Sequence, residues 1–118
     1  MKTILLVDDD THLLELMRAT LETPSRRILE ARDGEQAIQA NWKESVDAMV
    51  LDWMLPGLAG IHVIRSLVRY RMAPPTIMLT AKTRERDIAR ARFAGVQRYM
   101  TKPFSPAELL ANVEEILS

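Results

Sequence analysis

The sequence contains no cysteine, and its 16 basic residues are balanced by 16 acidic residues. The absence of cysteine excludes a disulfide framework, thiol catalysis and thiolate metal sites. A formal net charge of zero gives no indication of direct contact with nucleic acid or membrane. No stretch approaches the roughly 20 apolar residues of a membrane-spanning helix, and the apolar run after Lys2 is far shorter than that of a signal peptide. We therefore expect a cytoplasmic protein.

The chain does contain enough apolar residues for one hydrophobic core. It has 118 residues, of which 47% are hydrophobic, and this length suits one compact domain and is too short for two ordinary ones. It contains no internal repeat, linker or low-complexity tract. A domain of this size buries roughly two-thirds of the surface that its unfolded chain exposes. We expect a single domain over residues 1–118 that folds without metal or disulfide.

Short strand-like runs alternate with segments of helical periodicity along the whole chain. The runs with strand character are Thr3–Val7, Ile28–Ala31, Val46–Leu51, Pro75–Leu79 and Arg98–Thr101. Five strands that alternate with five helices predict an α/β fold, in which helices cover both faces of a mostly parallel sheet. The second strand is polar enough for an edge, but the pattern alone leaves the strand order open.

The apolar spacing also predicts which helical residues face the core. We expect the first helix to end before Pro24, the second to run from Gly34 to about Trp42, and the third to follow Gly60. The predicted core positions of these three helices are Leu13, Leu14, Leu16, Met17, Leu21, Ala37, Ile38, Trp42, Ile61, Ile64, Leu67 and Val68. The last helix should begin at Ser105, because a serine cap followed by proline and then by an acid is typical of a helix start.

Residues suited to chemistry follow four of the predicted strands. Asp8, Asp9 and Asp10 follow the first strand, Asp52 follows the third, Thr80 the fourth and Lys102 the fifth. In a doubly wound parallel sheet, ligands bind just beyond the carboxyl ends of the strands. If these four strands are neighbours, several carboxylates, a hydroxyl and an ammonium meet at one edge of the sheet.

This combination predicts phosphoryl chemistry. Carboxylates a few ångströms apart repel each other by about 1–4 kcal/mol per pair, so the cluster favours a cation, and Mg²⁺ suits hard oxygen ligands. A carboxylate can itself act as a nucleophile and form an aspartyl phosphate. Lys102 would then supply positive charge, while the Thr80 hydroxyl and a backbone N–H near Trp53 would supply hydrogen-bond donors.

Each of these residues also has an ordinary structural interpretation. An aspartate at a strand end is often a solvated loop residue or a helix cap, and we expect Asp10 to cap the first helix. Thr80 alone would be a strand or cap residue, and Lys102 alone a surface lysine. The chemical interpretation is favoured because the first acidic group, Asp52, the hydroxyl and the lysine each follow a different apolar strand.

Four motifs, ILLVDDD, VLDWMLPGLAG, IMLTAK and YMTKPFSPAELL, resemble those of response-regulator receiver domains in order and spacing. The resemblance extends from Lys2 to Leu117. It implies a flavodoxin-like (βα)5 fold, a doubly wound parallel sheet with strand order 2-1-3-4-5.

The resemblance also implies roles for individual residues. Asp52 corresponds to the phosphoacceptor, and Mg²⁺ would be held by Asp8, Asp9, Asp52 and the backbone carbonyl of Met54. Lys102 corresponds to the residue that pairs with a phosphoryl oxygen, and the Lys102–Pro103 bond is expected to be cis.

Two further positions correspond to the switch residues of the family. Thr80 matches the hydroxyl that follows the phosphoryl group inward, and Tyr99 matches the aromatic residue that turns inward upon phosphorylation. Without the resemblance, Tyr99 would be interpreted as a strand aromatic half covered by a helix.

The implied partners are a sensor histidine kinase and a downstream effector domain or protein. The motifs are most similar to those of receivers that precede a winged-helix DNA-binding domain. This chain ends with its last predicted helix, so it is expected to be either a stand-alone receiver or part of a longer regulator. The resemblance does not imply an enzyme in the usual sense, since such a domain catalyses only its own phosphoryl transfer and slow autodephosphorylation.

The sequence departs from that branch where a phosphorylation-dependent homodimer would form. Gly95-Val96-Gln97-Arg98 stands where Gly-Ala-Asp-Asp is usual, and Glu114 stands where a basic residue is common. We expect either loss of the dimer or a charge-reversed version that pairs Arg98 with Glu114 or Glu115. The segment from Lys82 to Arg98 has six basic and two acidic residues, which indicates either a solvated face or a basic docking surface.

Two alternative functions use the same residue types. A haloacid-dehalogenase-type phosphatase also has an aspartyl nucleophile and Mg²⁺, but the residues after Asp8-Asp9-Asp10 do not fit its motif. A pseudo-receiver would bind proteins without being phosphorylated, and the intact set of acidic, hydroxyl and lysine residues argues against it.

Overall fold

The computed structural model describes residues 1–118, which form one five-stranded sheet and five helices. The elements are β1 (Lys2–Val7), α1 (Thr11–Leu21), β2 (Arg26–Ala31), α2 (Gly34–Lys43), β3 (Ala48–Leu51), α3 (Gly60–Arg69), β4 (Thr76–Thr80), α4 (Glu85–Ala94), β5 (Arg98–Thr101) and α5 (Pro106–Leu117). All neighbouring strands are parallel, and their order is β2-β1-β3-β4-β5. The predicted α/β class and strand order are therefore confirmed. No helix has both the length and the apolar character needed to cross a membrane.

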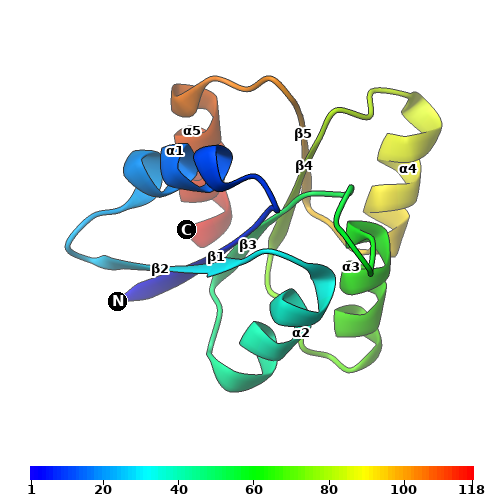
Figure 1. Ribbon diagram of the computed structural model, residues 1–118, viewed down its shortest axis with the longest axis horizontal. Coiled ribbons are helices and arrows are strands. Elements are labelled where there is room, and N and C mark those ends of the chain that lie inside the picture. Colours follow the sequence, from blue (N-terminus) through cyan, green and yellow to red (C-terminus); the bar gives the residue numbers. More distant parts are fainter.

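Helices cover both faces of the sheet: α1 and α5 pack on one face, and α2, α3 and α4 on the other (Figure 1). The central strands β1, β3 and β4 are consequently buried along almost their whole length. Side chains alternate between the two faces of a strand, so Ile4 and Leu6 of β1 join the core under α1 and α5, while Leu5 and Val7 join the opposite core. The sheet thus separates two apolar layers and leaves its edges for polar residues.

Three residues predicted to face the core are instead exposed: Leu16 at 44%, Trp42 at 60% and Val68 at 45%. Each lies directly beside a residue that is buried, namely Met17, Asn41 and Leu67. One residue turns an α-helix by about 100°, which is enough to move a side chain off the buried stripe. In α2 the buried position is taken by Asn41, whose amide donates to the carbonyl of Ala37 at 2.9 Å.

The helix starts near the carboxyl edge of the sheet are built as predicted. The side chain of Asp10 accepts from the backbone N–H groups of His12 and Leu13 and caps α1, and Ser105 caps α5 through the N–H of Glu108.

Gly60, at the start of α3, permits a close approach to the loop that follows β3. A Cβ atom on Gly60 would overlap the carbonyl oxygen of Asp52, and the N–H of Gly60 donates to the Trp53 carbonyl at 2.8 Å. The backbone of Asp52 and Trp53 leaves no room for a side chain here. A glycine is therefore required to hold α3 against the segment that carries Asp52.

Candidate functional site

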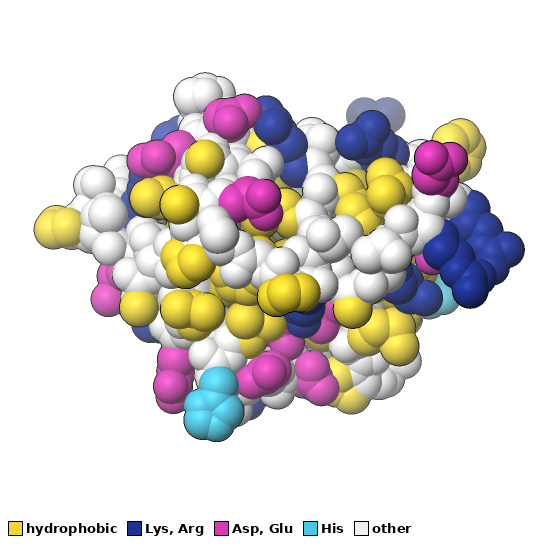
Figure 2. All heavy atoms as spheres, turned by 90° about the horizontal axis from the view of Figure 1, so that it is seen from above, with side chains coloured by type: hydrophobic (Ala, Val, Ile, Leu, Met, Phe, Trp, Pro, Cys, Tyr) yellow, Lys and Arg dark blue, Asp and Glu magenta, His cyan; other side chains and the backbone are white.

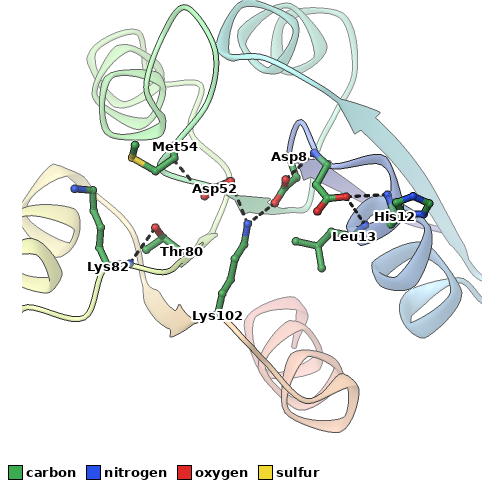
Figure 3. Close-up of polar contacts among 9 residues, drawn as sticks. Asp8, His12, Leu13, Asp52, Met54, Thr80, Lys82 and Lys102 are labelled. Atoms are coloured by element: carbon green, nitrogen blue, oxygen red, sulfur yellow. Dashed lines mark hydrogen bonds and ion pairs between the residues drawn. The ribbon is translucent and has the colours of Figure 1, made fainter.

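The residues predicted to carry chemistry meet at the carboxyl edge of the sheet (Figure 3). Asp8 follows β1, Asp52 follows β3, Thr80 ends β4 and Lys102 follows β5. These strands are neighbours and run in the same direction, so their carboxyl ends lie together. The parallel sheet is the reason that side chains far apart in sequence share one site.

Three carboxylates form the acidic part of the site. Asp8, Asp9 and Asp52 each offer an oxygen atom, and these atoms lie within 4.8 Å of one another. Asp8 is 1% exposed and Asp52 is 5% exposed, whereas Asp9 is exposed to solvent. Asp10 has a different role because its carboxylate caps α1. The cluster is buried on one side and open on the other, and its hard oxygen donors fit a cation such as Mg²⁺.

Lys102 bridges two of these carboxylates. Its Nζ atom lies 2.9 Å from Oδ2 of Asp8 and 3.1 Å from Oδ2 of Asp52. Figure 3 shows its side chain reaching from the end of β5 to both acids. One ammonium faces three carboxylates, so the positive charge in the site does not balance the negative charge.

The pKa directions reflect this imbalance. Burial is the main cause that raises the pKa of Asp52, the charge of Asp8 raises it further, and Lys102 and the N–H of Met54 oppose the shift. Burial would lower the pKa of Lys102, but its hydrogen bonds and charge interactions with Asp8 and Asp52 raise it overall. The ammonium therefore stays charged at neutral pH, while the ionised form of Asp52 is less favourable than that of an aspartate in water.

Backbone N–H groups and Thr80 complete the polar surroundings. The N–H of Met54 donates to Oδ1 of Asp52 at 3.2 Å, and the N–H of Asp10 donates to Oδ1 of Asp8 at 3.0 Å. Thr80 is completely buried, and its hydroxyl accepts from the N–H of Lys82 at 3.4 Å rather than contacting Asp52. The predicted donor after Asp52 is thus provided by Met54, one residue beyond Trp53.

Tyr99 lies outside the acidic cluster and is linked through Lys82 to Thr80. Its ring is half-buried, and its hydroxyl donates to the carbonyl of Lys82 at 2.8 Å. Burial, together with the charge of Asp87, raises the pKa of Tyr99.

The predicted cis bond between Lys102 and Pro103 is present.

One group near the site was not predicted. The ring of Trp53 is 5% exposed, and it has the Lys82 Nζ at 5.2 Å and the Arg90 Cζ at 5.4 Å from its centre. An aromatic residue directly after Asp52 was visible in the sequence. Its contact with Arg90 depends on how α4 packs beside the β3–α3 loop, which no spacing rule provides.

Comparison with known proteins places these features in a family context. The family model described as response regulator receiver domain matches residues 4–114. The chain is 42% identical over 116 residues to the alkaline phosphatase synthesis transcriptional regulatory protein PhoP of Bacillus subtilis. It is 41% identical over 118 residues to the phosphate regulon transcriptional regulatory protein PhoB of Pseudomonas aeruginosa.

Both alignments cover 98% of this chain but only 48% of PhoP and 52% of PhoB, so the chain spans about half the length of these curated relatives. Among solved structures, the BeF3-activated receiver domain of DrrB matches with a TM-score of 0.89 and 32% sequence identity. That match covers 99% of this chain and 97% of the DrrB chain.

The charge imbalance predicts that Asp52→Asn stabilises the metal-free protein. We expect the free energy of unfolding at neutral pH to rise by about 1–2 kcal/mol, because a neutral amide avoids the cost of burying an ionised carboxylate and its repulsion by Asp8. The pKa of Asp52 in the folded protein lies above its ordinary value of 3.8, so this cost is absent below pH 3.8 and grows as the pH rises through the folded-state pKa.

Urea denaturation at neutral pH and below pH 3.8 measures this difference. Asp10→Asn is the matched control, because asparagine caps a helix as well as aspartate does. A variant at Asp52 that is no more stable than the unchanged protein at neutral pH would contradict the prediction.

Proposed function

The chain belongs to the response regulator receiver domain family, whose members are phosphorylation-dependent signalling switches of two-component systems, and on this basis we propose that Asp52 is its phosphoacceptor. The observation that carries the proposal is the ammonium of Lys102, which lies between Asp8 and Asp52 at 2.9 and 3.1 Å. This ammonium would supply positive charge to the oxygens of a phosphoryl group on Asp52. We take residues 1–118 as one receiver domain.

Asp8 and Asp52 are held alike, each by Lys102 and by one backbone N–H, and Asp9 is exposed beside the cluster. We choose Asp52 as the nucleophile because it matches the phosphoacceptor of the family motif and follows the central strand β3. The Met54 N–H contacts one oxygen of Asp52 and Lys102 contacts the other. These donors hold the carboxylate and can then stabilise charge on the transferred group.

The donor that fits this chemistry is the phosphohistidine of a sensor histidine kinase. An oxygen of Asp52 would form a bond to phosphorus while the phosphorus–nitrogen bond breaks, and the imidazole would leave with that electron pair and take up a proton. Lys102 would remain protonated throughout, in keeping with its raised pKa. The product is an acyl phosphate on Asp52.

Receiver domains bind Mg²⁺ at their acidic pocket, and the cluster of Asp8, Asp9 and Asp52 fits this ion. We propose that these three carboxylates and the backbone carbonyl of Met54 hold it. When bound, it would neutralise the carboxylates and the phosphoryl oxygens during transfer. The Met54 N–H and Lys102 would orient Asp52 toward the phosphoryl donor.

Lys82 offers a route from the phosphoryl group to the surface. Its N–H donates to the Thr80 hydroxyl, and its carbonyl accepts from Tyr99. We propose that the phosphoryl group draws the Thr80 hydroxyl toward Asp52, that Lys82 moves with it, and that Tyr99 then turns inward. The α4, β5 and α5 surface would change shape and act on an effector.

As a receiver domain the chain is not a classical enzyme, and neither the phosphatase nor the pseudo-receiver alternative is favoured. PhoP and PhoB are transcriptional regulators. We propose that this domain likewise controls an effector in the cytoplasm, and that its only catalysis is its own phosphorylation and slow autodephosphorylation.

Incubation with Mg²⁺ and phosphoramidate, a small phosphoryl donor, is expected to add one phosphoryl group to the chain. Asp52→Asn should abolish the addition, and Lys102→Ala should slow it by about 10- to 100-fold because a charge donor to the phosphoryl oxygens is lost. Intact-mass spectrometry measures both effects, and Asp10→Asn should behave as the unchanged protein. Equal phosphorylation of the Asp52→Asn variant would refute the assignment.

The phosphoryl group on Asp52 is expected to persist for minutes or longer. Met54 and Lys82 stand two residues after Asp52 and Thr80, and Met54 is 63% exposed beside the site. A thioether is at best a weak hydrogen-bond acceptor, so it does not orient an attacking water. Phosphate-affinity gels after removal of the donor would follow the decay. Met54→Asn should accelerate it several-fold, Val68→Asn should not, and loss within seconds in the unchanged protein would contradict the prediction.

We infer that activation does not produce a charge-paired homodimer. Arg98 already binds Glu115 of the same chain at 2.7 Å, and Arg26 binds Glu114 at 3.1 Å. These pairs neutralise the charges that a reversed dimer would use, so a second copy gains little attraction. Sedimentation velocity with Mg²⁺ and beryllofluoride should show a monomer of 13.4 kDa. A dimer that Arg98→Ala abolishes would disprove this inference.

A further inference from the structure

Helix α4 has two exposed flanks of different character. Ala91 and Ala94 face the core, and on one side of them Ile88 and Arg92 line a hollow together with Tyr99 of β5. Arg86, Arg90 and Phe93 follow one another at intervals of four and three residues, which places them on one stripe on the other side. We call this stripe the outer flank of α4. It lies on the side of α4 that faces away from β5 and α5.

The outer flank carries positive charge that the rest of the chain does not neutralise. Lys82, Arg84, Arg86 and Arg90, with the single acid Asp87, line an open hollow of about 720 Å³. None of these four cations forms a salt bridge, since every ion pair of the chain uses Arg18, Arg26, Arg27, Arg98 or Lys102. Figure 2 shows dark-blue side chains gathered at the end of the molecule where α4 lies in Figure 1. A chain with zero net charge thus has a locally basic surface.

Two of the four cations are held in place by an aromatic ring. Lys82 and Arg90 both contact the buried ring of Trp53, at 5.2 and 5.4 Å from its centre. Cation–π attraction keeps the two groups near each other in spite of their like charge. Binding of a partner to Lys82 and Arg90 therefore costs less side-chain entropy than the ordering of mobile surface residues would.

An apolar side chain extends the same stripe. Phe93 is 94% exposed, more than any other large hydrophobic residue of the chain. It follows Arg90 by three residues and so lies on the same side of the helix. Neither the core nor the proposed phosphorylation site uses this ring, which leaves it available to a partner.

We propose that the outer flank of α4 binds an acidic segment of a partner protein that also carries an apolar side chain. Carboxylates of the segment would pair with Arg86 and Arg90, because the guanidinium fork matches a carboxylate in two-point contact, and the apolar side chain would cover Phe93. The proposal does not depend on phosphorylation of Asp52.

Nucleic acid fits this surface less well than an acidic protein segment. Nucleic-acid-binding domains are commonly basic overall, whereas this chain has an isoelectric point of about 6.7. The outer flank lies on one helix of 10 residues, which is about 15 Å long.

The test uses fluorescence anisotropy with a short labelled peptide of glutamates around a central leucine. The unchanged protein should bind it, and Arg86→Glu or Arg90→Glu should each weaken binding by about tenfold. Phe93→Ser should reduce affinity for this peptide to that for a leucine-free polyglutamate. Arg92→Glu is the matched control, since it makes the same charge change on the opposite side of the same helix and should leave binding nearly unchanged.

Three results would overturn the proposal: no binding of the peptide by the unchanged protein, an equal loss of binding in the Arg92→Glu variant, or tighter binding of a labelled oligothymidine than of the peptide. Circular dichroism melting establishes that each variant is folded. Beryllofluoride binding with Mg²⁺ reports on Asp52 separately, so failure of the docking surface is distinguishable from failure of the phosphorylation site.

Discussion

Repulsion between carboxylates at the carboxyl edge of the sheet is the constraint on which the rest of the site depends. Asp8 and Asp52 are nearly inaccessible to solvent, and Asp9 lies close to both. Burial weakens the screening that water provides, so each negative charge makes the next one less favourable. Lys102 offsets part of this repulsion by contacting both buried acids. The remaining negative charge suits the site to a cation, and it makes the ionised form of Asp52 a cost to the fold rather than a stabilising feature.

The fold supports this arrangement by burying the strands and leaving their ends open. Strands β1, β3 and β4 are covered on both faces, so the backbone that carries Asp8, Asp52 and Thr80 is held in a packed core. The loops that follow these strands lie outside the sheet. Lys82 lies in such a loop, where its backbone contacts both Thr80 and Tyr99 and its side chain contacts Trp53. One residue thus joins the end of β4, the residue after Asp52 and the aromatic ring of β5.

Most of the architecture follows from local patterns. Alternating strand-like and helical segments predicted the sheet and the helices, and the caps at Asp10 and Ser105 form as expected. The errors at Leu16, Trp42 and Val68 have one cause: each residue is apolar but lies one position beside the buried stripe of its helix. Apolar periodicity identifies the side of a helix that faces the core, but the packing of neighbouring elements decides how many residues on that side are buried. In α2 the position facing the core is taken by Asn41, whose side-chain amide donates to the Ala37 carbonyl of the same helix. An apolar pattern would not select this polar residue.

The sequence by itself determined the chemistry that was available: acids after the first and third strands, a hydroxyl at the end of the fourth and a lysine after the fifth, in motifs that identify the family. These features are local, because strand ends and motif spacings are written along the chain. Tertiary structure alone decided which groups touch. The contact of Lys102 with both Asp8 and Asp52 joins residues 94 and 50 positions apart, the pairing of Lys82 and Arg90 with Trp53 depends on where α4 packs, and the ion pair of Arg98 with Glu115 depends on the position of α5 beside β5. Such contacts arise from the packing of whole elements, and packing is a property of the folded chain rather than of any segment within it.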